Sequence, residues 1–318
     1  MIHEIAVPTP FAVGRVNCWL VEDDPLTLVD AGPNSATALV ALEAGLAQHG
    51  RRVEDLERIV LTHQHIDHIG LAQILADRSG AEVCALDALA PWLASYGAAM
   101  EADDRHAEDL MRRHGVPHDA VRALRSLVSL VRAWGAAVQV THELRDGGEL
   151  AFANRTWTVL HRPGHSPSDT VFHDEGRREL IGGDHLLARI SSNPLASRPL
   201  SGDGPAPSAL LSYLASLRAT REMDLEVVLG GHGEPVRDHR ALIDQRFAMH
   251  ERRAQKIAGV LRDQPLSAYE IARELWGDVA VTQAFLTLSE VLGHLDLLAQ
   301  RGAVTCAEDD GLVRFAAA

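Results

Sequence analysis

The ten residues Leu61–Gly70, with the sequence Leu-Thr-His-Gln-His-Ile-Asp-His-Ile-Gly, constrain this chain most. Four side chains that can bind a metal fall within six positions of this stretch: His63, His65, Asp67 and His68. Imidazole and carboxylate ligands together suit zinc, with iron or manganese as alternatives. The stretch contains no cysteine, which argues against a closed structural zinc site.

The pattern around the four ligands predicts two neighbouring metal sites. The apolar run at 59–61 predicts a short buried strand, and strand alternation would send His63 and His65 to the same side. A helix beginning near Ile69 would turn Asp67 and His68 around a second point.

Three later motifs each place a further metal-binding side chain in a glycine-containing loop after an apolar run. They are Pro163-Gly-His165-Ser, Gly182-Gly-Asp184 and Gly230-Gly-His232-Gly. A lone histidine at a strand end is more often a core or surface residue, but this combination is highly specific. The sequence resembles the metallo-β-lactamase superfamily, whose Thr-His-x-His-x-Asp-His motif is followed by a His, an Asp and a His. The resemblance runs from about residue 3 to about residue 240.

This resemblance implies a role for each matched residue. One metal would be held by His63, His65 and His165, and the second by Asp67, His68 and His232, with Asp184 bridging them. Asp30, after an expected strand, would lie beneath the metals, although it could also be a simple turn residue. His185, next to Asp184, has a weaker claim to a supporting role.

Two metal ions in such a site can perform hydrolysis. Cations about 3.5 to 4 Å apart can share a water, lower its pKa towards neutrality and stabilise the oxyanion formed on attack. A metal-bridging hydroxide would thus be the nucleophile, and Asp67 could orient it or pass a proton to the leaving group. We therefore expect a dinuclear hydrolase of an ester, thioester or lactone of a small molecule, with a metal-dependent endoribonuclease as the alternative.

Departures from particular branches of the family narrow the substrate. Drug-hydrolysing β-lactamases commonly have a cysteine where this chain has Asp184, which argues against antibiotic resistance. Glyoxalase II shares all seven ligand types but usually binds glutathione with basic residues that include lysine. The single lysine here, Lys256, lies outside the catalytic part.

The resemblance also implies the fold class and the domains. We expect an α/β, four-layer αββα metallo-β-lactamase sandwich over residues 1–238, with a helical insertion at about 88–140. The clearest insertion helix, at 120–134, has an apolar stripe at helical spacing that Leu127 and Leu130 would widen. This insertion would cap the substrate pocket, or else serve packing or a dimer surface.

Residues 239–318 predict helix, helix, helix and hairpin, the order of a winged helix. This tail is similar to that of the superfamily branch containing the mitochondrial β-lactamase-like endoribonuclease, called β-lactamase-like protein 2. It contains nine basic side chains against eleven acidic ones, whereas a wing that reads RNA is normally basic. The small-molecule hydrolase is therefore favoured, and a non-catalytic metal-binding module is disfavoured because all seven ligands are present.

Composition supports these expectations. The formal net charge of −14 does not favour nucleic acid as a partner. Three cysteines without metal or redox spacing fit reduced thiols, and no apolar run approaches the roughly 20 residues that span a bilayer. We expect a cytoplasmic protein with no membrane partner, acting on a small-molecule substrate, with a homodimer left open.

Overall fold

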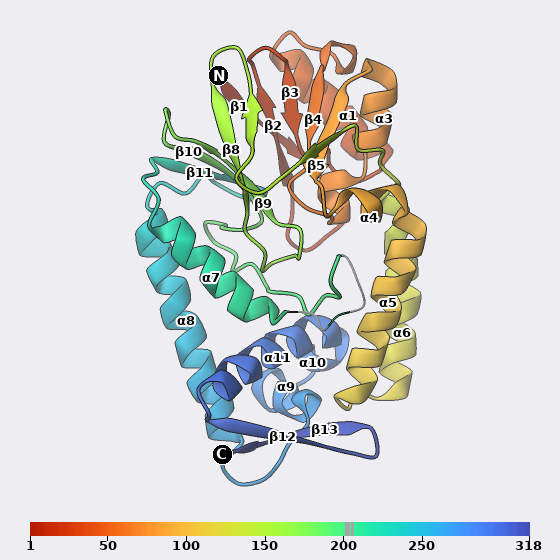
Figure 1. Cartoon of the computed structure of the whole chain (residues 1–318). Coiled ribbons are helices and arrows are strands. Elements are labelled where there is room, and N and C mark those ends of the chain that lie inside the picture. The colour runs from red at the N-terminus through yellow and green to blue at the C-terminus, as the bar shows by residue number, and fades with distance from the viewer. Residues whose placement is uncertain (201–203, 205–206) are drawn as a thin grey trace.

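The structure of the protein is a computed structural model describing residues 1–200, 204 and 207–318. Two mixed β-sheets form one end of the molecule, the upper part in Figure 1. The first sheet has the order β1 (Ile2–Val7), β2 (Val16–Val21), β3 (Thr27–Val29), β4 (Arg58–Val60), β5 (Glu82–Leu86), β6 (His142–Leu144). The second sheet has the order β11 (Val227–Gly230), β10 (Glu179–Gly183), β9 (Thr170–Asp174), β8 (Thr156–His161), β7 (Glu149–Ala151). Neighbouring strands from β3 through β6 are parallel, as are β10 and β11. The other neighbouring strands of the two sheets are antiparallel.

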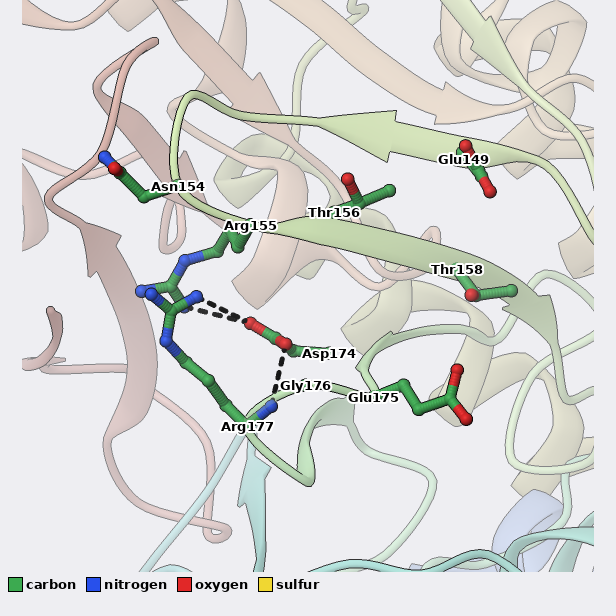
Figure 2. Close-up of a pocket in the computed structure, with 9 residues that line it drawn as sticks. All are labelled: Glu149, Asn154, Arg155, Thr156, Thr158, Asp174, Glu175, Gly176 and Arg177. Atoms are coloured by element: carbon green, nitrogen blue, oxygen red, sulfur yellow. Dashed lines mark hydrogen bonds and ion pairs between the residues drawn. The ribbon is translucent and has the colours of Figure 1, made fainter.

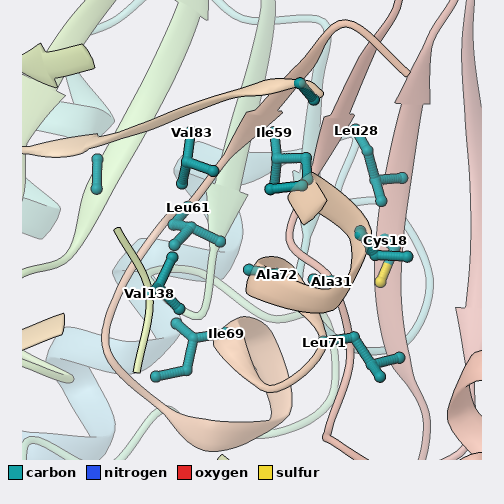
Figure 3. Close-up of a cluster of buried hydrophobic side chains, with 14 of the residues drawn as sticks. Cys18, Leu28, Ala31, Ile59, Leu61, Ile69, Leu71, Ala72, Val83 and Val138 are labelled. Atoms are coloured by element: carbon teal, nitrogen blue, oxygen red, sulfur yellow. The ribbon is translucent and has the colours of Figure 1, made fainter. Parts of the chain in front are cut away.

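Helices pack on the outer face of the first sheet. Alternate residues of a strand point to opposite faces, so Ile59 of β4 joins the cluster under the helices while Val60 joins the layer between the sheets. Figure 3 shows the outer cluster, in which Ile59 lies near Val83 and Ala72. The covering helices are α1 (Ala36–Gln48) and α3 (Ala72–Ser79), with the short η1 (Val53–Asp55) beside α3.

The second sheet alternates in the same way. Leu180 of β10 and Val228 of β11 belong to the cluster that includes α7 (Ala209–Arg221), while Ile181 and Leu229 face the first sheet. The predicted α/β fold with two mixed sheets and outer helices is confirmed.

The predicted insertion is helical, but the buried face of its clearest helix is narrower than the apolar stripe in the sequence. It consists of α4 (Ala90–Ala94), α5 (Tyr96–Arg113), α6 (His118–Val131) and η2 (Arg132–Trp134). Leu127 and Leu130, which widen the apolar stripe in the sequence, are 57% and 69% exposed and therefore lie outside the buried face of α6. The helix packs against α5, η2 and α10, and these contacts leave the side chains of Leu127 and Leu130 uncovered.

The C-terminal elements have the predicted order, with one additional short helix, α10, before the last helix. They are α8 (His239–Val260), α9 (Ala268–Trp276), α10 (Val279–Thr282), α11 (Ala284–Gln300), β12 (Val304–Asp309) and β13 (Leu312–Ala317). One apolar cluster contains Leu214 of α7, Ile257 of α8 and Leu288 of α11, so it crosses the predicted boundary at residue 238. None of the helices that the structure describes combines the length and apolar character needed to cross a membrane.

Candidate metal centre

The motif that follows β4 turns into a helix sooner than predicted. His65 has an extended backbone and precedes α2 (Ile66–Ile69), whose first turns contain Asp67 and His68. The expectation of a helix beginning near Ile69 is therefore wrong by one turn. The earlier start does not separate the four motif side chains, because all of them take part in the compact groups of possible ligands described below.

The three later motifs lie at the carboxyl ends of strands in the second sheet. His165 follows β8, Asp184 follows β10, and His232 follows β11. Because β10 and β11 are parallel, their carboxyl ends reach the same edge. A Cβ added to Gly231 would lie 2.4 Å from Oδ1 of Asp184, so glycine is needed for this close approach.

Three histidines form the first group. Nδ1 of His65 lies 3.0 Å from Nε2 of His63 and 2.9 Å from Nε2 of His165. The three nitrogen atoms thus converge on one point, as the resemblance implies for the first metal.

The second group lies beside the first. Nε2 of His232 lies 3.4 Å from Oδ2 of Asp67, whose Oδ1 is 4.0 Å from Nε2 of His68. Asp184 contacts both groups, because its Oδ2 is 3.5 Å from Nε2 of His165 and 3.5 Å from Nε2 of His232. Its Oδ1 is 3.5 Å from Nε2 of His68.

Asp30 lies beneath this centre and orients two of its histidines. Its Oδ2 lies 2.7 Å from Nδ1 of His68, and its Oδ1 accepts a 2.9 Å hydrogen bond from the backbone N–H of Thr62. The Thr62 hydroxyl also donates to Asp30 and lies 2.9 Å from Nδ1 of His63. Sequence reasoning did not single out Thr62, although it stands inside the motif.

Backbone carbonyls orient two more histidines. Nδ1 of His232 is 2.7 Å from the carbonyl oxygen of Arg15, and Nδ1 of His165 is 3.2 Å from that of Asn193. Both contacts leave Nε2 directed at the centre. Sequence reasoning missed them because a backbone carbonyl carries no residue-type signal.

His185 points away from the metal ligands. Its Nε2 lies 2.9 Å from the Thr220 hydroxyl of α7, and its carbonyl accepts a hydrogen bond from Tyr213. Burial lowers the pKa of His185 to about 3, so it is a neutral residue of the core beneath α7.

Electrostatics keep several ligands in the form that metals require. Burial, with the neighbouring histidines, lowers the pKa of His63 well below its usual value and that of His65 to about 3, which leaves their lone pairs free. Burial opposes ionisation of Asp184, but His68 and His232 outweigh it and hold the pKa of this carboxyl well below its usual range.

Two histidines behave in the opposite way. Burial opposes their protonation, but nearby carboxylates raise the pKa of His68 well above its usual value and that of His232 to about 9. A metal ion that binds these nitrogen atoms would therefore displace protons.

Unpartnered atoms show that the residues fit metal ions. Nε2 of His68 and Oδ1 of Asp184 are buried without a hydrogen-bond partner among the described residues. Buried polar atoms almost always have a partner. Binding of a divalent cation by the His68 and Asp184 side chains would give both of these atoms a partner.

A largely apolar cavity of about 610 Å³ opens onto this centre. Side chains of the His/Asp centre line part of it, and further parts of its wall come from α5, α6, the segment 195–198 and residues 282–286. A second hollow, of about 510 Å³, lies over β7, β8 and the turn after β9 (Figure 2). It is polar, and Arg155 and Arg177 meet Asp174 there in ion pairs, so it has no part in the metal centre.

Two mixed sheets with a His/Asp centre at their edge define a metallo-hydrolase fold. The chain belongs to the Metallo-beta-lactamase superfamily, whose family model matches residues 12–232. The predicted family and enzyme class are thus confirmed.

Among its relatives, the chain is similar to "Probable metallo-hydrolase YqjP" of Bacillus subtilis (strain 168), with 37% identity over 98% of this chain and 96% of the relative. The human "Acyl-coenzyme A thioesterase MBLAC2" is 31% identical over 54% of this chain and 58% of its own length. The similarity to "Beta-lactamase-like protein 2 homolog" of Caenorhabditis elegans is distant, at 21% identity over 93% and 83% of the two chains.

A solved structure shares the whole architecture. The "Beta-lactamase domain protein" from Burkholderia ambifaria has a TM-score of 0.85 and 30% identity, covering 100% of this chain and 92% of that chain. The C-terminal elements therefore belong to an arrangement that this relative also has.

Proposed function

We propose that this protein is a dinuclear metal-dependent hydrolase of acyl compounds: an ester, a thioester or a lactone. The position of Asp184 carries the proposal, because this carboxylate lies within 3.5 Å of a histidine from each ligand group. We assign one metal to His63, His65 and His165, and the other to Asp67, His68 and His232. Zinc is the first candidate, since imidazole and carboxylate oxygen suit it.

Two bound divalent ions would supply Lewis acidity and a water of lowered pKa. The protein's own residues would do the rest. Asp67 lines the cavity, and a carboxylate that binds a metal through one oxygen keeps the second free. That oxygen can accept the proton of the attacking water and return it to the leaving group. Thr62 and Asp30 would hold His63 and His68 in their ligating orientation.

The cavity favours an acyl substrate over RNA. A phosphodiester needs cationic contacts, whereas apolar side chains dominate the walls next to this centre. The name of the human thioesterase relative supports a thioester as the first class to test. We further propose that residues 239–318 form a winged-helix-like unit whose role is structural, pocket-bordering or dimerising.

The experiment measures turnover and metal content together. The purified protein is tested on thioesters, simple esters, lactones, phosphodiesters and single-stranded RNA. Removal of metals by a chelator should abolish acyl turnover, and zinc should restore it with two ions per chain. Asp67→Asn, assayed with enough zinc to fill both sites, should lose at least about 100-fold in kcat, as expected for loss of a general base. Cleavage of RNA with no acyl turnover would overturn the proposal.

A further inference from the structure

We propose that the 610 Å³ cavity is an acyl-chain site for a linear aliphatic substrate and that Leu124 limits the chain length. This inference rests on the proposed function and names its substrate class. Three features of the cavity support it: apolar side chains run along the walls, the charged side chains in the walls are paired, and the cavity leads away from the His/Asp centre.

Two helices provide parallel apolar rows. On α5, Met100, Ala107 and Met111 line the cavity at helical spacing. On α6, Val131, Val128 and Leu124 do the same. Residues three and four positions apart share a helix face, so the α6 row forms a continuous strip of hydrocarbon. Asp103 and Asp104 interrupt the α5 row.

The charges in the walls are neutralised by partners. Asp103 accepts hydrogen bonds from the indole N–H of Trp92 and from Arg198. Glu108 is buried and pairs with Arg125 of α6. A bound hydrocarbon chain would exclude water from these charged side chains, but each of them would keep its protein partner.

The cavity leads away from the metals along α6. The end of the insertion touches the metal loop, since a Cβ on Gly135 would lie 2.8 Å from Cγ2 of Ile66. Val131 is therefore the near end of the row. Leu124 is seven residues further, about 10 Å along the helix at 1.5 Å per residue. An acyl group with its carbonyl at the centre would place its tail beside Leu124.

The C-terminal segment closes the remaining side. Ala284, Phe285 and Leu286 of α11 line the cavity. Two hydrogen bonds attach this wall to the loop at 193–196. Asn193 Nδ2 donates to the Leu286 carbonyl at 3.1 Å, and the Ala196 N–H donates to the Ser289 hydroxyl at 3.2 Å. The tail of the protein thus completes the acyl site.

The test uses a series of straight-chain acyl thioesters from about 2 to about 16 carbons. Burial of each methylene is worth up to about fourfold in affinity, so kcat/KM should rise along the series and then level off. In Leu124→Trp the plateau should come at shorter chains, and the ratio of long-chain to short-chain kcat/KM should fall at least tenfold, about two blocked methylenes.

The control is Leu127→Trp, the same change on the same helix at a side chain that is 57% exposed. Its chain-length profile should match the wild type. A second measurement does not need turnover: displacement of a fluorescent fatty acid by unlabelled fatty acids from metal-free protein should show the same length dependence and the same shift in Leu124→Trp.

The outcomes separate the two proposals. Fatty-acid binding without acyl turnover would overturn the proposed function but would still support the acyl-chain site. Turnover that ignores chain length, with no fatty-acid binding, would overturn the acyl-chain site alone. An equal effect of Trp at 124 and 127 would mean that Leu124 does not set the length.

Discussion

At the residue scale, Asp30 shows how an outer carboxylate controls the centre. It has a φ of 61°, a conformation that Asn also tolerates well. Asp30→Asn should therefore keep the backbone while removing the negative charge beside Nδ1 of His68. We expect metal affinity to fall about 10- to 100-fold, as measured by competition with a chromogenic chelator.

The matched control is Asp174→Asn, which removes another buried carboxylate in the polar hollow, whose lining includes no residue of the His/Asp centre. It should lower the thermal stability without changing metal affinity. Equal metal affinity in Asp30→Asn and the wild type would show that Asp30 is only a turn residue.

Asp184 is the residue on which the dinuclear assignment depends. Asp184→Asn keeps the shape of the side chain but removes the charge that faces His68 and His232. We expect fewer than two tightly bound metals by elemental analysis and a loss of at least about 100-fold in kcat, with the fold preserved by circular dichroism. Two tight metals and near-normal turnover would contradict the bridging role.

The seven histidine and aspartate residues that the structure brings together can be picked out in the sequence because each belongs to a motif with its own residue type. His63 and Asp184 can be recognised without coordinates for this reason. The carbonyls of Arg15 and Asn193 could not be predicted, because every residue has a carbonyl and only the folded chain decides which one meets a histidine.

At the element scale, Gly70 lets three segments meet behind the metal loop. A Cβ there would lie 2.2 Å from the backbone nitrogen of Asn34 and 2.4 Å from the carbonyl oxygen of Trp134. Those two atoms are joined by a 2.6 Å hydrogen bond, which ties the insertion to the sandwich. Gly70→Ala should lower the free energy of unfolding by about 1–3 kcal/mol in chemical denaturation, as overpacking does.

Gly97, within α5, provides the control for Gly70. A Cβ there meets nothing within 4 Å, so Gly97→Ala should raise stability by about 0.5–1 kcal/mol through helix propensity. A stability loss at Gly97 as large as that at Gly70 would show that the crowding at Gly70 is not the cause.

The pairing of α8 with α11 predicts a pH dependence of stability. Nδ1 of His250 lies 3.2 Å from Nε2 of His294, whose Nδ1 contacts the Glu290 carbonyl. Burial, with His294 and Arg253, lowers the pKa of His250 to about 3. The unfolded chain, with an ordinary histidine pKa of about 6.5, then binds more protons than the folded one between these values. Stability from this group is therefore full above about pH 6.5 and is lost as the pH falls.

We expect His250→Gln to reduce the slope of unfolding free energy against pH between pH 5 and 6.5, by up to about 1.4 kcal/mol per pH unit. Denaturant titrations of both proteins at matched metal content give this difference. An unchanged slope would mean that His250 already shares a proton in the folded protein.

Elements with a local signal in the sequence could be predicted, whereas the short strand β6 could not. The capping residue Ser35 and Gly80 after α3 mark helix ends in the sequence. The three residues of β6 have no apolar pattern of their own, and β6 exists because it pairs with β5 after the insertion. The outward direction of Leu127 likewise depends on which helices surround α6.

At the scale of the whole molecule, the cavity could not be predicted because its walls come from three distant parts of the sequence. The insertion suggested a cap, but the contribution of Phe285 requires the tail to fold back against the loop after His165. The same packing argues that the tail is not a detachable module, since Ile257 and Leu288 share a core with Leu214 of α7.

The charges of the tail give the last prediction, which concerns nucleic acid. Several of its arginines are already paired with acids, namely Arg253 with Glu290, Arg301 with Glu251, and Arg314 with Glu270. Binding to a phosphate backbone requires several free cationic side chains, and the chain as a whole has a charge of −14. We therefore expect single-stranded RNA to bind no more tightly than the nonspecific range of about 10⁻⁴–10⁻⁶ M at physiological salt.

Fluorescence anisotropy of labelled RNA with the intact, metal-loaded protein measures this affinity, and repeating it at several salt concentrations gives the number of phosphates neutralised. The control is Glu251→Gln with Glu270→Gln, which frees Arg301 and Arg314 and should steepen the salt dependence by no more than about two phosphates. Sub-micromolar binding by the wild type with a steep salt slope would mean that the tail presents a cationic surface despite its composition, and would favour the ribonuclease over the acyl hydrolase.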